Sequence, residues 1–299
     1  MAYHVPVLLQ ESIDALVANK DGIYVDATFG GGGHSKVILD TISAKGHLYA
    51  FDQDSDVLEN LISENEHFTF IQHNFRFLKR FLRLHGVRQV DGILADLGVS
   101  SHQLDSPERG FSHRFDTELD MRMNRDGGTT AAQLINTERA ERLQQLFSDY
   151  GEVRNARSLA NAIVEARRLK EIRTVGELIM VMEPLIRGNR QRYLSQVFQA
   201  LRIEVNEEMQ ALTDFLEGAL EVLRPGGRLV VISYHSLEDR LVKRFLKSGN
   251  VDGTVVKDFY GNIDRPFKLI TRKSVMASDE EVRQNPRARS ARLRVAEKI

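Results

Sequence analysis

The sequence predicts an α/β protein: a doubly wound, mainly parallel sheet of seven strands with an all-helical domain inserted into it. Short apolar strands alternate with amphipathic helices up to residue 98, which is typical of a parallel sheet covered by helices on both faces. The next convincing strand begins only at residue 228, although a crossover between strands needs only ~10–12 residues. Most of the intervening segment has helical periodicity, so we predict that it forms the inserted domain.

The first third of the chain supplies four of the strands. Apolar runs bounded by turn residues predict them at 22–28, 47–52, 68–72 and 91–98. Helices are predicted between them, over 35–42, directly after a run of glycines, and over 55–65, where apolar residues have helical spacing.

The middle of the chain is predicted to be helical, over 130–150, 155–169 and 175–186. Apolar residues that recur from Leu194 to Leu223 predict one long helix, which ends at Pro225 and the two glycines that follow it. We therefore assign 1–108 and 205–299 to the sheet domain and 109–204 to the helical insertion.

The last part of the chain returns to the sheet. A strand is predicted at 228–234, and Ser236 opens a helix with the spacing of a capping box. Two further strands, at 267–271 and 291–297, predict an antiparallel edge.

Composition restricts the class of protein. The chain has 299 residues, no cysteine and a formal net charge of −1. The lack of cysteine excludes disulfides, zinc–thiolate sites, iron–sulfur clusters and a cysteine nucleophile, and we predict no metal site. Neither a signal peptide nor a membrane-spanning apolar run is apparent, so we expect a cytoplasmic protein with no membrane partner. A nucleic-acid partner would have to be bound by local basic clusters.

Four consecutive glycines, 30–33, follow the first strand, at the edge of the sheet where ligands bind in open α/β folds. They do not fit the dinucleotide fingerprint, because Ser35 or Lys36 stands where its third glycine belongs. The Walker pattern also fails, since no Gly-Lys-Ser/Thr follows. We therefore predict a cofactor that places no pyrophosphate at this turn.

Acidic residues end the first two strands. Asp52 comes about 20 residues after the glycines, where a carboxylate can accept both ribose hydroxyls of an adenosine. Asp26 could buttress the loop or accept from an ammonium group. This pattern is common to nicotinamide enzymes and S-adenosylmethionine enzymes. The alternative is that the glycines only make a tight turn and Asp52 caps the next helix.

Several further stretches narrow the choice. They are 4–9 (HVPVLL), 28–35 (TFGGGGHS), 96–105 (DLGVSSHQLD), 108–112 (ERGFS), 119–123 (LDMRM), 198–202 (FQALR), 236–240 (SLEDR) and 285–290 (NPRARS). Together, in this order and spacing, they make the sequence resemble the RsmH (formerly MraW) family of ribosomal RNA small-subunit methyltransferases. The resemblance extends from His4 to Glu297.

The resemblance implies a class I S-adenosylmethionine-dependent methyltransferase fold, which has a Rossmann-like sheet, here with the helical insertion as its RNA-facing domain. It implies S-adenosylmethionine as the cofactor and N4-methylation of a cytosine in the decoding region of 16S rRNA, within the small ribosomal subunit. Carried over by position, the cofactor contacts are Gly32, Gly33, His34, Asp52, Phe75, Asp96 and Gln103.

The sequence departs from the family pattern at three positions. Gly31 stands where many relatives have arginine, which puts in doubt any charge that the family places in that loop. His102 stands where proline is frequent, and Tyr234 where phenylalanine is frequent. None of the three removes a carried-over contact.

The physical reading of these residues leaves alternatives open. Phe75 could stack on adenine or simply belong to the core. Asp96 and Gln103 could hold the amino and carboxylate ends of a bound methionine, and the alternative for Asp96 is a helix cap. Asp96 and His235 are the candidate catalytic acceptors for the N–H bonds of a cytosine amine, and His235 could equally be a structural histidine.

Local clusters of arginine could bind RNA phosphates. They lie at 109–125, at 187–192 and at 283–294. Competing hypotheses are a nicotinamide-dependent oxidoreductase, a non-catalytic RNA-binding factor in ribosome assembly, and the same methylation on another RNA or on DNA. The sequence leaves homo-oligomerisation open.

Overall fold

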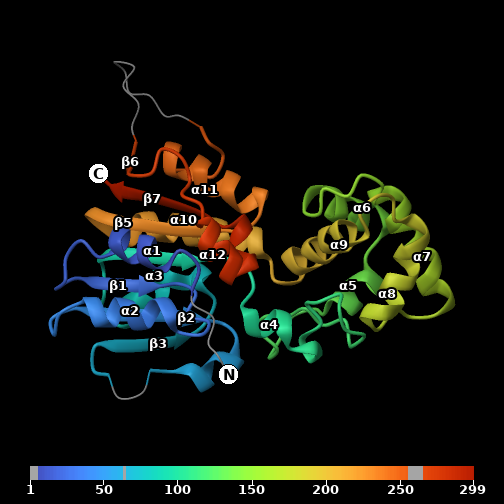
Figure 1. Cartoon of the computed structure of the whole chain (residues 1–299), viewed down its shortest axis with the longest axis horizontal. Helices are drawn as coiled ribbons and strands as arrows, with labels where there is room; N and C mark the ends of the chain where they lie inside the picture. Colours follow the sequence, from blue (N-terminus) through green and yellow to red (C-terminus); the bar gives the residue numbers. More distant parts are fainter. Residues whose placement is uncertain (1–5, 63–64, 255–264) are drawn as a thin grey trace. The chain divides into compact units, whose positions relative to one another are not determined.

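The computed structural model describes residues 6–62, 65–254 and 265–299, which form two compact units (Figure 1). The first unit comprises Met1–Gly98 and Gln210–Ile299, and the second comprises Val99–Met209. The predicted insertion, 109–204, falls within the second unit. The beginning of the stretch 4–9 lies outside the described residues.

The first unit is built around a seven-stranded sheet in the order β3-β2-β1-β4-β5-β7-β6. Its strands are β1 (Ile23–Asp26), β2 (His47–Asp52), β3 (Phe68–Gln72), β4 (Val90–Asp96), β5 (Leu223–Ser233), β6 (Phe267–Leu269) and β7 (Arg292–Lys298). β1 to β5 run parallel, whereas β7 is antiparallel to both of its neighbours, β5 and β6. The order is that of the doubly wound dinucleotide-binding fold with one antiparallel strand added, so the predicted fold class is confirmed.

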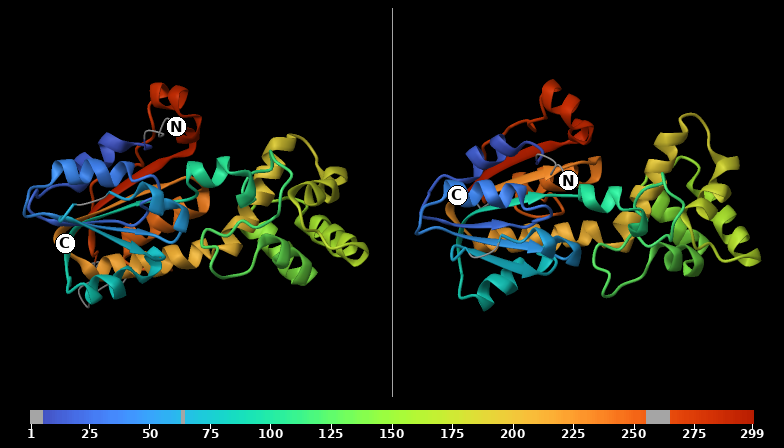
Figure 2. Two further views of the ribbon diagram at one scale, coloured as in Figure 1. Left: turned by 90° about the horizontal axis from the view of Figure 1, so that it is seen from below. Right: turned by 60° about the horizontal axis from the view of Figure 1, so that its bottom comes forward.

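Helices cover both faces of this sheet (Figure 2). Alternate strand residues point to opposite faces, so in β4 Ile93 packs in one core and Leu94 in the other. One face buries apolar residues of α3 (Leu78–Leu84), α10 (Glu208–Val222) and α11 (Ser236–Ser248). The other face buries those of α1 (Leu9–Leu16) and α2 (Gly33–Thr41), with additional packing from α12 (Asp279–Gln284) and the 3-10 helix η5 (Pro286–Ser290).

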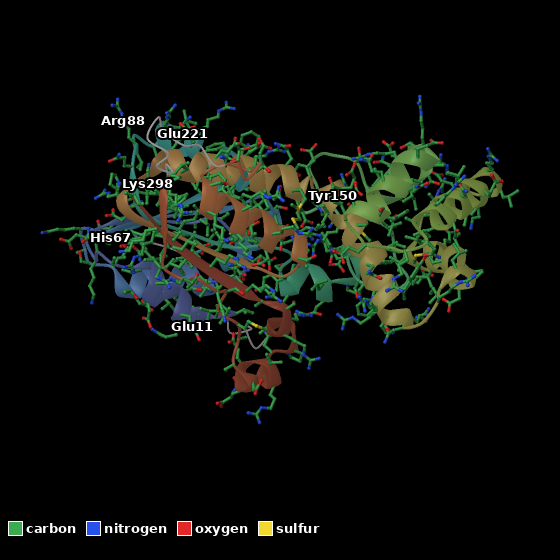
Figure 3. The ribbon with its side chains drawn as sticks, turned by 90° about the horizontal axis from the view of Figure 1, so that it is seen from above. Glu11, His67, Arg88, Tyr150, Glu221 and Lys298 are labelled. Atoms are coloured by element: carbon green, nitrogen blue, oxygen red, sulfur yellow. The ribbon has the colours of Figure 1, made fainter. Side chains whose placement is uncertain are left out.

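Lys298, the last residue of β7, connects the sheet to a helix (Figure 3). Its ammonium donates to the carbonyl oxygens of Leu220 and Leu223, at 2.6 Å each. These carbonyls lie where α10 ends and β5 begins, so a cation satisfies groups that the helix leaves without an internal partner.

The second unit is helical. It contains α4 (Ser101–Asp105), α5 (Ala131–Thr137), α6 (Ala140–Asp149), α7 (Ala156–Leu169), α8 (Val175–Met182) and α9 (Arg190–Val205), with the 3-10 helices η3 (Pro107–Arg109) and η4 (Glu183–Leu185). Capping boxes open α4, α5 and α8 at Ser100, Thr130 and Thr174. Its apolar core is separate from the cores of the sheet.

Among the described residues, no helix combines the length and the apolar character needed to cross a membrane.

The predicted helix 55–65 is wrong in kind and in length. Only Ser55–Asn60 form a helix, η1, and it is a 3-10 helix. Of the apolar residues that suggested an amphipathic face, Val57 is buried, but Leu58 and Leu61 are 41% and 37% exposed. The apolar residues therefore do not form one buried face, although their spacing is helical. Residues 63–64 lie outside the described residues.

One long helix was predicted from Leu194 to Leu223, but the structure has two, α9 and α10, because the helix is interrupted at Asn206 and Glu207. The Asn206 side chain donates to the carbonyls of Met121 and Arg202 and accepts from the backbone N–H of Met123. Glu207 has a φ of 49°, which no α-helix tolerates. The helical spacing of apolar residues continues across this interruption, so the sequence pattern does not reveal it.

The predicted turn at Pro225 lies inside a strand. β5 begins at Leu223, and its pairing with β4 shifts between Val90 and Gly92, a bulge that accommodates Pro225 and Gly226. Proline and a glycine with a φ of 79° are typical of such an irregularity.

Candidate functional site

Three aspartates gather at one edge of the sheet, because each is the last residue of its strand. Asp26 ends β1, Asp52 ends β2 and Asp96 ends β4. β1 lies between β2 and β4, and all three run parallel. Their carboxyl ends form the edge at which open α/β sheets bind ligands.

Asp52 fastens the glycine loop to the end of β2. Its Oδ2 accepts the backbone N–H of Gly30 at 2.8 Å, and its Oδ1 accepts that of Asp54 at 2.9 Å. Burial raises the pKa of Asp52 to about 6, although these two hydrogen bonds oppose the change. Each oxygen still has a lone pair for a further donor. The alternative was that Asp52 caps the next helix. In the structure the N-cap of that helix, η1, is Asp54.

Gly30 leaves open space next to this carboxylate. Its φ is 51°, and no heavy atom lies within 4 Å of the point where a Cβ would be. The neighbouring glycines differ: a Cβ on Gly32 would lie 2.9 Å from the ring of Phe29, and one on Gly33 would lie 2.2 Å from that of Pro6. Gly32 and Gly33 are thus required by the packing of the loop itself.

Asp26 buttresses the loop, one of the two roles considered for it. It is fully buried and accepts the Ser35 hydroxyl at 2.7 Å and the Thr28 backbone N–H at 3.1 Å. Burial raises the pKa of its carboxyl group, and the bonds from Ser35 and Thr28 oppose this. The Thr28 hydroxyl in turn accepts the backbone N–H of Asp96 at 2.7 Å, so Thr28 links β1 to β4.

His34 lies in the first turn of α2 and is only 5% exposed. Its Nδ1 is 3.9 Å from Oδ2 of Asp96, and within the described part of the chain its Nε2 has no hydrogen-bond partner. Burial lowers the pKa of His34, against the opposing effect of Asp96. The ring is therefore neutral near pH 7 and has a buried nitrogen available to a ligand.

Asp96 lies at the centre of the site. Its Oδ1 accepts the hydroxyl of Tyr234 at 2.8 Å, and its side chain is 22% exposed. Burial raises the pKa of Asp96 to about 6, while His34 and Tyr234 act in the opposite direction. At pH 7 the carboxylate is mostly ionised and can accept a hydrogen bond or a proton. The sequence interpretation missed both the Tyr234 hydrogen bond and the role of Thr28.

His235 occupies a structural position. It is the N-cap of α11, where its Nδ1 accepts the backbone N–H of Glu238 at 3.4 Å. Its Nε2 lies 3.1 Å from Oε1 of the buried Glu238 carboxylate. Nδ1 is thus engaged in the cap, as expected of the structural alternative, whereas Nε2 is close to Glu238 but makes no hydrogen bond within the described part of the chain.

Phe75 and Gln103 are the two remaining predicted contacts. Phe75 is half-buried in the 3-10 helix η2 (Phe75–Phe77), and its ring packs edge-on against Phe215 with centroids 5.3 Å apart. Gln103 belongs to the second unit, where it is 5% exposed and completes the capping box of Ser100. The first unit therefore brings together Gly32, Gly33, His34, Asp52 and Asp96 around the glycine loop.

Some of the arginines in the predicted RNA-binding clusters are internal. Arg109 is 1% exposed and donates to the carbonyls of Arg122 and Met123. Arg122 is paired with Asp120 at 2.7 Å. Arg294 is 8% exposed and forms two hydrogen bonds with Asp239.

Comparison with known proteins identifies the family. The model of the MraW methylase family matches residues 1–299. A protein of Phocaeicola vulgatus, ribosomal RNA small subunit methyltransferase H, is 57% identical over 297 residues, which cover 99% of this chain and 97% of that protein. The protein of the same name from Flavobacterium johnsoniae is 56% identical over 300 residues, covering 100% of this chain and 99% of that one. The solved structure of an rRNA methylase from Streptococcus thermophilus aligns over 100% of this chain and 99% of its own, but at 12% identity and a TM-score of 0.42 it adds nothing to this assignment. The chain belongs to the MraW methylase family.

Proposed function

We propose that this protein transfers a methyl group from S-adenosylmethionine to the exocyclic N4 of a cytosine in the decoding region of 16S rRNA. The observation that carries the substrate class is the 57% identity, over 99% of the chain, to a protein named ribosomal RNA small subunit methyltransferase H. The choice of N4 and of the decoding region rests on the family resemblance. The chemistry of the strand ends supports a reaction at an amino group.

The residues around the glycine loop fit an adenosine cofactor. Asp52 offers lone pairs to ribose hydroxyls next to the open space at Gly30, and His34 offers a buried nitrogen without a partner among the described residues. When bound, S-adenosylmethionine supplies a methyl group on a positively charged sulfur, which the amino nitrogen takes as it loses a proton. Phe75, as a partner for adenine, and Gln103 remain proposed contacts that rest on the resemblance.

Asp96 is the proposed acceptor for the amine. A cytosine amine is a poor nucleophile because its lone pair is delocalised into the ring, so an acceptor on one of its N–H bonds favours reaction. Asp96 is partly exposed and mostly ionised at pH 7. Of the two candidates we prefer it, because the side chain of Asp96 is 22% exposed, whereas that of His235 is 8% exposed and uses its Nδ1 to cap α11. His235 then holds the start of α11 in place.

The second unit is the proposed RNA-facing domain. Six of its exposed arginines have no ion-pair or hydrogen-bond partner for their side chains among the described residues, and four of the six lie on segments that hydrogen bonds join: Arg154, Arg157, Arg187 and Arg192. We call these four the arginine patch. Two of them, Arg187 and Arg192, come from a predicted cluster, whereas Arg154 and Arg157 were missed because they are far apart from it in the sequence.

Hydrogen bonds bring the segments of the arginine patch together. Asn155, which lies between two of the arginines, donates to the carbonyl of Leu185 at 3.1 Å. Gln196, one turn after Arg192, donates to the carbonyl of Glu152 at 3.2 Å. Such a concentration of unneutralised positive charge suits the phosphates of RNA.

The arginine patch can be tested by salt dependence. Replacing Arg154 and Arg192 with alanine should weaken binding of 16S rRNA roughly tenfold at moderate salt and make it less dependent on salt, because each lost phosphate contact lowers the slope by about 0.7. Arg168→Ala is the matched control, since this exposed arginine of α7 is already paired with Glu165. Equal loss in the control and the double variant would contradict the assignment.

The proposed reaction can be tested directly. The protein is incubated with methyl-labelled S-adenosylmethionine and small ribosomal subunits that lack the modification, beside naked 16S rRNA and DNA. We expect label in the subunits, recovered as N4-methylcytosine, which would also establish the small ribosomal subunit as the substrate. Label confined to another RNA or to DNA would change the substrate, and cofactor binding without any transfer would favour the non-catalytic assembly factor.

A further inference from the structure

A tyrosine hydroxyl donates to the carboxylate of Asp96, the proposed acceptor. Tyr234 directly follows β5, and its hydroxyl donates to Oδ1 of Asp96 at 2.8 Å. Asp96 is paired with Ile232 in the adjacent strand, so the two side chains meet across neighbouring strand ends. Tyr234 is half-buried, so water competes weakly for this hydrogen bond.

Gly98 and Glu238 restrict the position of Tyr234. A Cβ on Gly98 would lie 3.6 Å from Cδ2 of Tyr234, and Gly98 has a φ of 99°, so a residue without a side chain lies beside the ring. The backbone N–H of Tyr234 donates to Oε2 of Glu238 at 3.0 Å. Glu238 is itself buried and held in the capping box of α11. Hydrogen bonds therefore hold Tyr234 at both ends, through its backbone N–H and through its hydroxyl.

The hydrogen bond divides the Asp96 carboxylate into two unlike oxygens. Oδ1 is engaged by Tyr234, whereas Oδ2 has no hydrogen bond from the residues that the structure describes, since Nδ1 of His34 lies 3.9 Å away, which is longer than a hydrogen bond. The backbone of Asp96 is held separately by Thr28. Rotation of the carboxylate would break the Tyr234 bond, so one orientation is favoured.

We propose that Tyr234 is a positioning residue for Asp96: its hydroxyl fixes the carboxylate so that Oδ2 is presented to the amino group of the methyl acceptor. This rests on the proposed function, because it assigns a task within that site. The tyrosine acts through the aspartate and itself touches no reacting atom.

The positioning role has a consequence for pH. The groups that face the Asp96 carboxylate are Tyr234, His34 from α2, Asp26 from β1 and Glu238 from α11. Tyr234 stabilises the ionised form by donation, whereas Asp26 and Glu238 disfavour it. Removing only the hydroxyl, as in Tyr234→Phe, should therefore raise the pKa of Asp96.

The experiment compares the wild-type protein with Tyr234→Phe. Because phenylalanine is frequent at this position in the family, the role proposed for the Tyr234 hydroxyl is specific to this chain. We expect kcat to fall about tenfold while the KM for S-adenosylmethionine changes less, since the substitution removes one hydrogen bond to Asp96 but leaves the carboxylate itself in place. The acid limb of the rate profile should move upward by about one pH unit. Tyr49→Phe is the matched control, because Tyr49 is a buried tyrosine of β2 whose hydroxyl takes no part in the Asp96 hydrogen bonds.

A second measurement needs no turnover. The carboxyl carbon of Asp96 is titrated by NMR in the labelled, full-length wild type and in both variants. An upward displacement of its titration in Tyr234→Phe alone supports the proposal, and an unchanged titration or an unchanged kcat overturns it. A wild type that binds cofactor but methylates nothing would refute the proposed function instead, and the titration would still decide the role of Tyr234.

Discussion

The acidic residues of the two units differ in the direction of their pKa shifts. In the first unit, burial raises the pKa of Asp26, Asp52 and Asp96 above the usual range. In the second unit, donation from Arg122 outweighs burial and lowers the pKa of Asp120, and donation from Lys170 lowers that of Glu177 to about 2. Asp120 and Glu177 have cationic partners, whereas the aspartates at the strand ends lie where charge is disfavoured.

This difference separates acids that stabilise a fold from acids that prepare a site. A carboxylate with a cationic partner stabilises the folded protein. A carboxylate that is buried without a cationic partner lowers the stability of the protein in the absence of cofactor. Groups with pKa values raised by burial and gathered in one place are candidates for binding and catalysis. The first unit thus carries the proposed chemistry at a cost in stability, and three substitutions can test this.

The largest effect is expected for Asp52→Ala. It removes the carboxylate that the proposed ribose contact needs and also frees the N–H of Gly30, so affinity for S-adenosylmethionine should fall about 100-fold or more. Isothermal titration calorimetry measures the loss. Asp40→Ala, an exposed acid of α2, is the matched control. Unchanged affinity would remove Asp52 from the site.

Asp96→Asn should have opposite effects on activity and stability. Methylation should be lost, but the protein without cofactor should become more stable at pH 8 by about 2 kcal/mol, since an amide avoids the cost of the buried charge. The pKa of the folded-state carboxyl is raised from 3.8 to about 6, so the wild type loses stability as pH rises between these values. The difference should therefore vanish near pH 4 in urea titrations. A variant that is less stable at pH 8 would contradict the comparison.

The smallest effect is expected for Asp120→Asn, and its sign is reversed. The pKa of Asp120 is lowered, so its carboxylate stabilises the fold above its usual pKa of 3.8, and this contribution is lost as pH falls below that value. The variant should be less stable at pH 8 by about 1 kcal/mol, a typical contribution of a mostly shielded ion pair. Urea titrations at pH 8 and pH 3 measure it. A gain in stability at pH 8 would show that the two units do not differ in this way.

Much of the sheet could be predicted from local pattern. The predicted strands 47–52 and 68–72 coincide with β2 and β3, because both are short apolar runs bounded by turn residues. The position of Asp52 at a strand end follows from the same pattern, whereas the predicted strand 91–98 runs two residues past Asp96, the last residue of β4. The break at Asn206 could not be predicted, because its side chain bonds to residues more than 80 positions away.

The candidate site was only partly predictable for a similar reason. The sequence places Asp96 and Tyr234 in different strand ends, but their hydrogen bond joins residues 138 positions apart. The burial of Arg109 likewise depends on carbonyls 13 and 14 residues away in an irregular segment. Spacing identifies which residue types are available, whereas tertiary contacts decide which of them remain free for a ligand.

The antiparallel strand β7 has a consequence for biosynthesis. β6 pairs only with β7 in the sheet, and β7 is the last of the seven strands to be translated. Until β7 has been synthesised, β6 has no strand to pair with, and β5 exposes one of its edges. The sheet can therefore close only after residues 292–298 have left the exit tunnel, and these two strand edges stay unpaired until then.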